Sequence, residues 1–144
     1  MEKVTKDALP RFAASIVDRL PRKDDGATVV ALMGDLGAGK TTFVSALAKE
    51  LGVEDPVQSP TYVLMKKYPL TGAPYRALIH IDAYRLEKPE EFAALRPEQF
   101  IRDPHTLVCV EWPERIGGML PAPDLTLKFS SQDAGEGERY IGVE

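Results

Sequence analysis

The chain contains Gly34-Asp35-Leu36-Gly37-Ala38-Gly39-Lys40-Thr41, which matches the phosphate-loop pattern of Gly, four residues, Gly-Lys and Ser or Thr. Successive backbone N–H groups in such a turn can all point at a polyanionic triphosphate. The glycines permit positive φ angles and a close approach that side chains would block. We therefore expect a nucleotide-binding loop in which Lys40 reaches the β- and γ-phosphates and the Thr41 hydroxyl binds Mg²⁺.

The sequence on either side of this loop has the pattern that a phosphate loop requires. Residues 28–33 form a continuous apolar run with β-branched side chains, which is typical of a strand buried on both faces in a parallel sheet. A helix is expected from Thr41 to Leu51, and Gly52 is suited to end it. A strand before the loop and a helix after it argue against a chance glycine-rich turn. We expect Asp35 either to cap the loop or to lie near the γ-phosphate, and capping is the favoured role.

Helical and strand-like patterns continue along the rest of the chain. Apolar residues recur at three- and four-residue spacing over 9–20, which predicts an amphipathic helix. Pro89 and Pro97 each precede acidic residues and are expected to start a helix. Further strands are expected in a hairpin of 61–68 with 76–82, and at 107–110, 125–129 and 140–143. This order predicts an α/β, P-loop NTPase-like single domain over residues 1–144, with a mixed sheet flanked by helices.

Composition and charge exclude several classes of protein. The 144 residues carry a formal net charge of −4, which argues against a chain that grips nucleic acid through its phosphates on its own. The single cysteine, Cys109, allows no internal disulfide and favours a reducing compartment. Residues 1–7 are polar, and no run approaches the roughly 20 apolar residues of a membrane-spanning helix. We expect a cytoplasmic protein with no membrane contact.

Two carboxylates stand where a P-loop enzyme needs acidic groups. Asp82 and Glu111 each end an apolar strand-like run, and such positions hold the metal or orient the attacking water. Thr61 lies in the stiff polar turn Ser59-Pro60-Thr61-Tyr62. Its hydroxyl either makes ordinary turn contacts or senses the γ-phosphate as switch loops do.

Four blocks together carry a family resemblance: Gly34 to Phe43, Ser59-Pro60-Thr61-Tyr62, His80-Ile81-Asp82-Ala83-Tyr84-Arg85-Leu86 and Val110-Glu111-Trp112-Pro113-Glu114. In this order they resemble the TsaE (YjeE) family over almost the whole chain. The resemblance implies a bacterial ATPase, requiring ATP and Mg²⁺, that supports formation of threonylcarbamoyladenosine in tRNA. It also implies partners of the TsaD and TsaB families, with tRNA reached only through their complex.

The resemblance also implies roles for individual residues. Thr41 and Glu111 resemble the magnesium ligands, Asp82 resembles the acid that orders the attacking water or the metal's water shell, and Thr61 resembles the first switch. Trp112 resembles a tryptophan beside the nucleotide, although core packing remains an alternative. The predicted catalytic residues are Lys40, Thr61, Asp82 and Glu111. The predicted nucleotide-binding residues are Gly34, Asp35, Leu36, Gly37, Ala38, Gly39, Lys40, Thr41, Thr42 and Trp112.

Several neighbouring residues are expected to be structural, and other functions stay open. We expect His80 to be a hydrogen-bonded core histidine, Tyr84 and Arg85 to be structural, and Cys109 to be buried and inert. No arginine finger is evident, so low activity is expected for the isolated chain. A small-molecule or nucleoside kinase is the main alternative, but it needs an arginine-rich lid that this sequence does not offer. A GTPase lacks support because no Asn-Lys-x-Asp motif is present. A nucleotide-dependent binding module without turnover is a further alternative.

Overall fold

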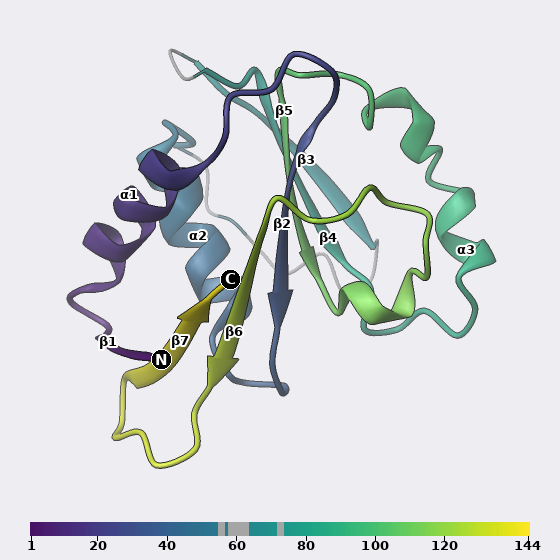
Figure 1. Ribbon diagram of the computed structural model, residues 1–144. Coiled ribbons are helices and arrows are strands. Elements are labelled where there is room, and N and C mark those ends of the chain that lie inside the picture. Colours follow the sequence, from purple (N-terminus) through teal and green to yellow (C-terminus); the bar gives the residue numbers. More distant parts are fainter. Residues whose placement is uncertain (55–56, 58–63, 72–73) are drawn as a thin grey trace.

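The strand that precedes the glycine-rich loop lies in the middle of a seven-stranded sheet in the computed structural model (Figure 1). The structure describes residues 1–54, 57, 64–71 and 74–144. The strands are β1 (Glu2–Thr5), β2 (Thr28–Met33), β3 (Met65–Pro69), β4 (Ala77–Asp82), β5 (Thr106–Glu111), β6 (Leu125–Ser130) and β7 (Glu138–Val143). The helices are α1 (Leu9–Arg19), α2 (Lys40–Glu50) and α3 (Glu90–Ala93), with 3₁₀ turns η1 (Pro97–Gln99) and η2 (Pro113–Arg115).

The four central strands of the sheet are parallel, and the outer strands pair antiparallel with their neighbours. Its strand order is β1-β7-β6-β2-β5-β4-β3, in which β6, β2, β5 and β4 run parallel. The β3–β4, β6–β7 and β1–β7 pairs are antiparallel. Parallel strands place their carboxyl ends at one edge of the sheet, where ligands bind in open α/β folds. In this register Glu111 lies opposite both Leu32 and Asp82, so the loop after β2 and the two acidic strand ends share one edge.

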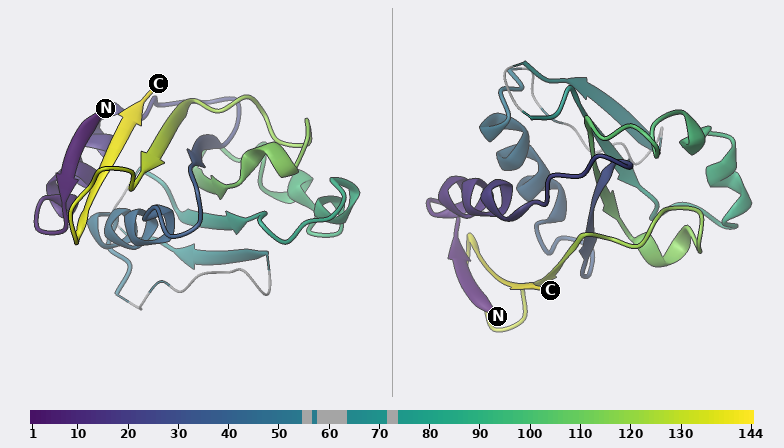
Figure 2. Two further views of the ribbon diagram at one scale, coloured as in Figure 1. Left: turned by 90° about the horizontal axis from the view of Figure 1, so that it is seen from below. Right: turned by 45° about the horizontal axis from the view of Figure 1, so that its top comes forward.

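Helices cover both faces of the sheet, and β2 supplies side chains to both layers. Helices α1 and α2 lie on one face, and α3 with the 3₁₀ turns lies on the other (Figures 1 and 2). Val30 and Leu32 belong to the hydrophobic cluster beneath α1 and α2, whereas Val29 and Ala31 belong to the cluster on the α3 side. A strand buried on both faces explains why its sequence is a continuous apolar run.

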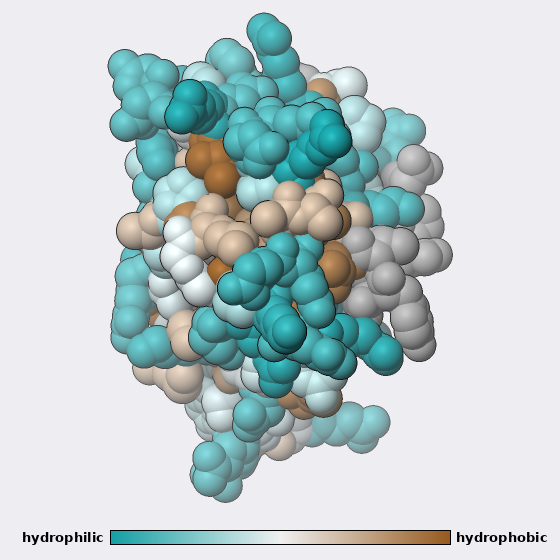
Figure 3. Space-filling view, turned by 90° about the vertical axis from the view of Figure 1, so that its right-hand side faces the viewer, coloured by the Kyte–Doolittle hydropathy of each residue, from teal (hydrophilic) through white to brown (hydrophobic). Residues whose placement is uncertain are grey.

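The α3 side is the smaller layer, and short elements enclose its cluster. Phe92 of α3 and Ile116, just after η2, are almost fully buried against the sheet. The molecular surface on this side is hydrophilic over most of its upper and lower parts, with more apolar residues in a band between them (Figure 3). The short helices therefore act chiefly as a cover for the apolar face of the parallel strands.

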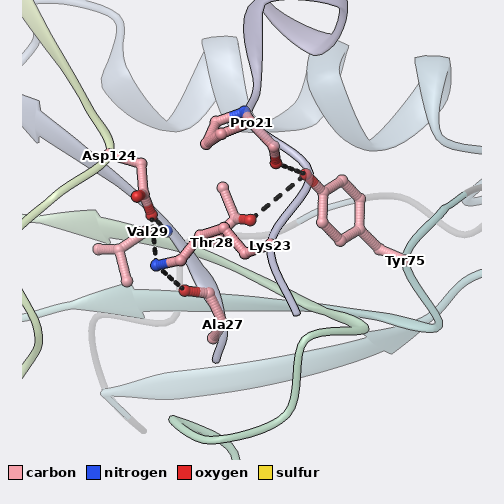
Figure 4. Close-up of polar contacts among 7 residues, drawn as sticks. All are labelled: Pro21, Lys23, Ala27, Thr28, Val29, Tyr75 and Asp124. Carbon is pink, nitrogen blue, oxygen red and sulfur yellow. Dashed lines mark hydrogen bonds and ion pairs between the residues drawn. The ribbon is translucent and has the colours of Figure 1, made fainter. Parts of the chain in front are cut away.

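Polar contacts fix the amino end of β2, at the edge opposite the glycine-rich loop (Figure 4). The Asp124 carboxylate accepts a hydrogen bond from the Val29 amide at 2.9 Å and pairs with Lys23 at 3.3 Å. The Tyr75 hydroxyl lies 3.4 Å from the Thr28 hydroxyl. These contacts join segments that are distant in sequence at the start of the central strand.

The fold class and most elements expected from the sequence are confirmed, with two differences. Strand β1 was not predicted, because Val4 is its one buried residue and gives no strand pattern. The helix starts at Pro89 and Pro97 are present, but they lead only to a four-residue helix and a 3₁₀ turn. Thr61, the predicted switch residue, lies outside the described residues. Within the described ranges, no helix has the length and apolar character needed to span a membrane.

Candidate nucleotide-binding site

The glycine-rich loop has a backbone shape that its glycines make possible. Gly34, Gly37 and Gly39 have φ angles of 145°, 77° and 102°. A Cβ atom on Gly34 would lie 2.5 Å from the carbonyl oxygen of Phe129 in β6, so only glycine fits there. Gly39 is the residue before α2, so the loop ends at the positive end of that helix's dipole. The loop and helix thus form the geometry that binds phosphate groups in other proteins.

Lys40 is held inside the loop and is 4% exposed. Its ammonium donates hydrogen bonds to the carbonyl oxygens of Gly34 and Asp35, the latter at 3.2 Å. It also lies 4.1 Å from the centroid of the Trp112 ring, a cation–π contact. Burial lowers the pKa of Lys40, and the nearby charge of Glu111 partly opposes this effect. The loop carbonyls thus hold this charge beside the cleft.

Glu111 receives two hydrogen bonds on a single oxygen atom. The Thr41 hydroxyl donates to Oε2 at 2.8 Å, and Nε2 of His80 lies 2.6 Å from the same oxygen. Because a carboxylate accepts hydrogen bonds, we assign the imidazole proton to Nε2. Glu111 is 3% exposed, and His80 is fully buried. The expectation of a hydrogen-bonded core histidine is confirmed, and its partner is the acid at the end of β5.

Asp82 ends the strand next to Glu111 and is 5% exposed. The Tyr84 amide donates to its Oδ1 at 3.1 Å, a bond that fixes the carboxylate at the turn after β4. Asp82 and Glu111 are register partners across β4 and β5. Both acids therefore face the region beside the glycine-rich loop, as the sequence indicated.

A cleft of about 230 Å³ joins these groups. Its lining residues come from the loop, the start of α2 and the ends of β4 and β5: Leu36, Gly37, Gly39, Lys40, Thr41, Thr42, Asp82, Glu111 and Trp112. Trp112 has a positive φ of 58°, and its ring packs against the Tyr84 ring with centroids 5.1 Å apart and the ring planes tilted by 50°. This contact confirms that Tyr84 packs, and it fixes the indole against Lys40.

The structure brings together most of the residues that the sequence singled out. The remaining loop residues, Gly34, Asp35 and Ala38, shape the loop, and Asp35 acts through its backbone carbonyl, which accepts bonds from Ala38 and Lys40. Cys109 is fully buried as expected, and burial raises the pKa of its thiol far above the usual range. In the part of the chain that is described, no three His, Cys, Asp or Glu side chains form a metal-binding group.

The structure places one further residue, Arg139, against the loop, and no motif in the sequence pointed to it. Its Nη1 lies 3.5 Å from the carbonyl oxygen of Gly39. In β7, Ile141 and Val143 pack on the α1–α2 cluster, and Arg139 shares their alternating face of the strand. A positively charged residue on the inward face of a predicted strand could have indicated a functional role. The group that it contacts, however, depends on how β7 pairs in the sheet.

A glycine-rich loop between a central parallel strand and a helix, beside acidic ends of neighbouring strands, defines the P-loop NTPase fold. The family model of the threonylcarbamoyl adenosine biosynthesis protein TsaE matches residues 4–141, and the chain belongs to this family. The TsaE family takes part in tRNA threonylcarbamoyladenosine biosynthesis.

Individual relatives agree with this family membership. The chain is 39% identical over 119 residues to a protein described as tRNA threonylcarbamoyladenosine biosynthesis protein TsaE from Treponema pallidum, covering 81% of each chain. It is 38% identical over 109 residues to the Haemophilus influenzae protein of the same description, covering 74% of this chain and 65% of the relative. The chain therefore spans just under two thirds of that relative's length, and 54% of the length of the Nostoc relative. The crystal structure of Bacillus subtilis YdiB is similar with a TM-score of 0.69 at 27% identity, covering 97% of this chain and 80% of that one.

Proposed function

We propose that this protein is a magnesium-dependent ATPase that supports the protein complex forming the N6-threonylcarbamoyl modification of adenosine in tRNA. The observation that carries the proposal is the hydrogen bond from the Thr41 hydroxyl to Glu111, because both residues line the phosphate-loop cleft together with Lys40. Family membership supports the pathway. The presence of Lys40, Thr41 and two carboxylates in the cleft supports ATP hydrolysis as the reaction.

The loop residues would bind the triphosphate. Backbone amides between Gly34 and Thr41 and the amino end of α2 would surround the phosphates. Lys40 now donates to two loop carbonyls, and phosphate oxygens would replace these acceptors with stronger, charged ones. Trp112 would limit the open side of the site, because its ring already covers the ammonium.

The residues present fit a magnesium ion. Mg²⁺ prefers oxygen ligands and usually binds through one or two protein oxygens together with substrate phosphates and water. Because the Thr41 hydroxyl gives its hydrogen to Glu111, its oxygen lone pairs stay available to a cation. His80 holds the Glu111 carboxylate in place from the buried side. When bound, the ion would supply charge neutralisation on the phosphates.

Asp82 would position the attacking water by accepting a hydrogen bond from it. Its carboxylate lines the cleft and is fixed through Oδ1 by the Tyr84 amide. Alternatively, Asp82 would accept hydrogen bonds from water molecules bound to the magnesium ion. We keep Thr61 as the proposed first switch, whose hydroxyl responds to the γ-phosphate.

We assign TsaD-type and TsaB-type proteins as partners, and contact with tRNA only through their complex. The net charge of −4 fits a chain that does not itself grip a polyanion. We further propose a cytoplasmic location, because the proposed partner complex acts on tRNA.

The test is phosphate release from ATP and from GTP, with and without TsaD-type and TsaB-type partners. We expect slow release from ATP alone, clear stimulation by the partners, and little release from GTP. A Lys40→Ala chain in the same assay controls for contaminating ATPases. Absence of release in every mixture would contradict the ATPase, and transfer of phosphate to a small acceptor without partners would favour a kinase instead.

A further inference from the structure

Arg139 of β7 places its guanidinium group against Gly39 of the glycine-rich loop. A Cβ atom on Gly39 would lie 2.3 Å from Nη1 and 2.9 Å from Cζ of Arg139. The guanidinium therefore occupies the space that a side chain at position 39 would need. Glycine at this position therefore permits two things, the positive φ angle of 102° and the close approach of the Arg139 guanidinium.

Among the described residues, the N–H donors of Arg139 make few hydrogen bonds. Its Nε is buried with no hydrogen-bond partner there, and the bond from Nη1 to the Gly39 carbonyl is long at 3.5 Å. The acid beside it in sequence, Glu138, instead pairs with Lys3 at 3.2 Å. A buried donor without an acceptor is costly, and a guanidinium has five N–H donors. This arrangement indicates a site prepared for an anionic acceptor.

The strand order shows which part of a nucleotide could reach Arg139. Strands β5 and β4, which carry Glu111 and Asp82, lie on one side of β2, and β6 and β7 lie on the other (Figures 1 and 2). Under the function proposed above, the metal-binding end of the triphosphate lies near Glu111. The phosphate nearest the nucleoside then lies toward β7, where Arg139 meets the loop.

We propose that Arg139 is a nucleotide-binding residue whose guanidinium contacts the α-phosphate. A planar guanidinium can donate two parallel hydrogen bonds to phosphate oxygens, which a lysine ammonium cannot do. The contact would hold the end of the nucleotide that Lys40, Thr41 and the acids do not reach. This inference rests on the proposed function, because it places the metal end at β5.

The test compares three ligands by calorimetry in the presence of Mg²⁺: ATP, ADP and pyrophosphate. Arg139→Gln should weaken ATP and ADP binding alike, by roughly 10- to 100-fold for a charged hydrogen bond, and leave pyrophosphate binding unchanged. Arg139→Lys should recover part of the loss, because the positive charge remains. Lys128→Gln on neighbouring β6 is the matched control, since that lysine is half-exposed and pairs with Glu144, and it should bind as the wild type does.

Each other outcome has a distinct meaning. A loss for ATP but not for ADP would place Arg139 at the γ-phosphate and overturn the proposal. An unchanged affinity in Arg139→Gln, or an equal loss for all three ligands with a lowered unfolding temperature, would also overturn it. A lysine variant as weak as the glutamine variant would instead indicate stacking on the base. Failure of the proposed function is distinguishable, because the wild-type protein itself would then bind neither nucleotide.

Discussion

Lys40 has its positive charge in surroundings that oppose ionisation, and this has a measurable consequence. The side chain is 4% exposed, and burial is the largest cause of its lowered pKa. Loop carbonyls and the Trp112 ring stabilise the ammonium without neutralising it. Phosphate oxygens would supply the missing negative charge, so phosphate binding and protonation of Lys40 should favour each other.

The affinity for Mg-ATP should therefore fall as pH rises, beginning below the ordinary lysine pKa of 10.5. The charged form binds phosphate, and a lowered pKa in the free protein means that this form is lost at a lower pH. Calorimetric titrations from neutral pH to about pH 10 would measure the fall. Lys40→Arg is the control, because arginine stays charged over this range and should flatten the profile. An equal fall in the arginine variant would assign the titration to another group.

The two carboxylates should differ in their effect on magnesium dependence. The Glu111 carboxylate accepts a hydrogen bond from the Thr41 hydroxyl, whereas the Asp82 carboxylate accepts one from the Tyr84 amide. We expect Glu111→Ala to raise the Mg²⁺ concentration at half-maximal ATP hydrolysis by about tenfold or more, and Asp82→Ala to lower the rate with a smaller shift. Glu111→Gln, which keeps the shape of the side chain, controls for folding. Identical magnesium titrations for Glu111→Ala and Asp82→Ala would contradict the assignment.

Among the elements, strand β6 packs directly against the start of the glycine-rich loop. The carbonyl oxygen of Phe129 lies where a side chain on Gly34 would be, and the Phe129 ring packs on Phe43 of α2 with centroids 5.8 Å apart. Phe43 also meets Phe12 of α1 at 5.9 Å. The strand, the loop and the helix are thus packed as one unit, and the loop's shape depends on this packing.

Gly34→Ala should therefore destabilise the protein strongly. The new methyl group would meet backbone atoms of β6, which cannot move aside as a flexible side chain can, and the φ of 145° adds strain. We expect a loss of about 2–3 kcal/mol or more in the free energy of unfolding, measured by urea denaturation. Gly118→Ala is the control, because no described atom lies within 4 Å of its added Cβ. Equal stability of the two variants would argue against the close packing of loop and strand.

In the molecule as a whole, the carboxyl ends and the amino ends of the parallel strands carry different groups of contacts. The carboxyl edge holds the candidate site, and the amino edge holds the contacts of Asp124 with Lys23 and with the Val29 amide. Nothing in the cleft's lining comes from this second group. Stability and ligand binding should therefore respond separately to mutations at the two edges.

Asp124→Ala should lower stability without weakening ATP binding. It removes an acceptor from the Val29 amide and from partly buried Lys23, for which about 1–3 kcal/mol is a reasonable cost. Urea denaturation gives the free energy of unfolding, and calorimetry at a temperature where the variant is folded gives the affinity. Exposed Asp18 in α1 offers a control substitution, Asp18→Ala, which should change neither quantity. A large loss of affinity in Asp124→Ala would show that the two edges are coupled.

The sequence predicts this molecule well where the pattern is local. The phosphate loop, its Lys40 and the flanking strand and helix follow from residue types and spacing within about one supersecondary unit. Asp82 and Glu111 were found because both end apolar runs, and parallel strands end at one edge. Pairing over long distances was not visible: the contact of His80 with Glu111 depends on the register of β4 and β5, and that of Arg139 depends on the place of β7 in the sheet.

The residue roles proposed above all depend on the binding of a triphosphate and Mg²⁺ by residues 34–41. Calorimetric titration of Mg-ATP into the wild-type chain and into Lys40→Ala tests this binding, with Lys49→Ala as the control, because Lys49 is an exposed side chain in the last turn of the same helix. We predict binding by the wild type and by Lys49→Ala, and a loss of at least about tenfold in Lys40→Ala, with unchanged circular dichroism. Equal affinity in all three chains, or no binding by the wild type, would contradict the claim.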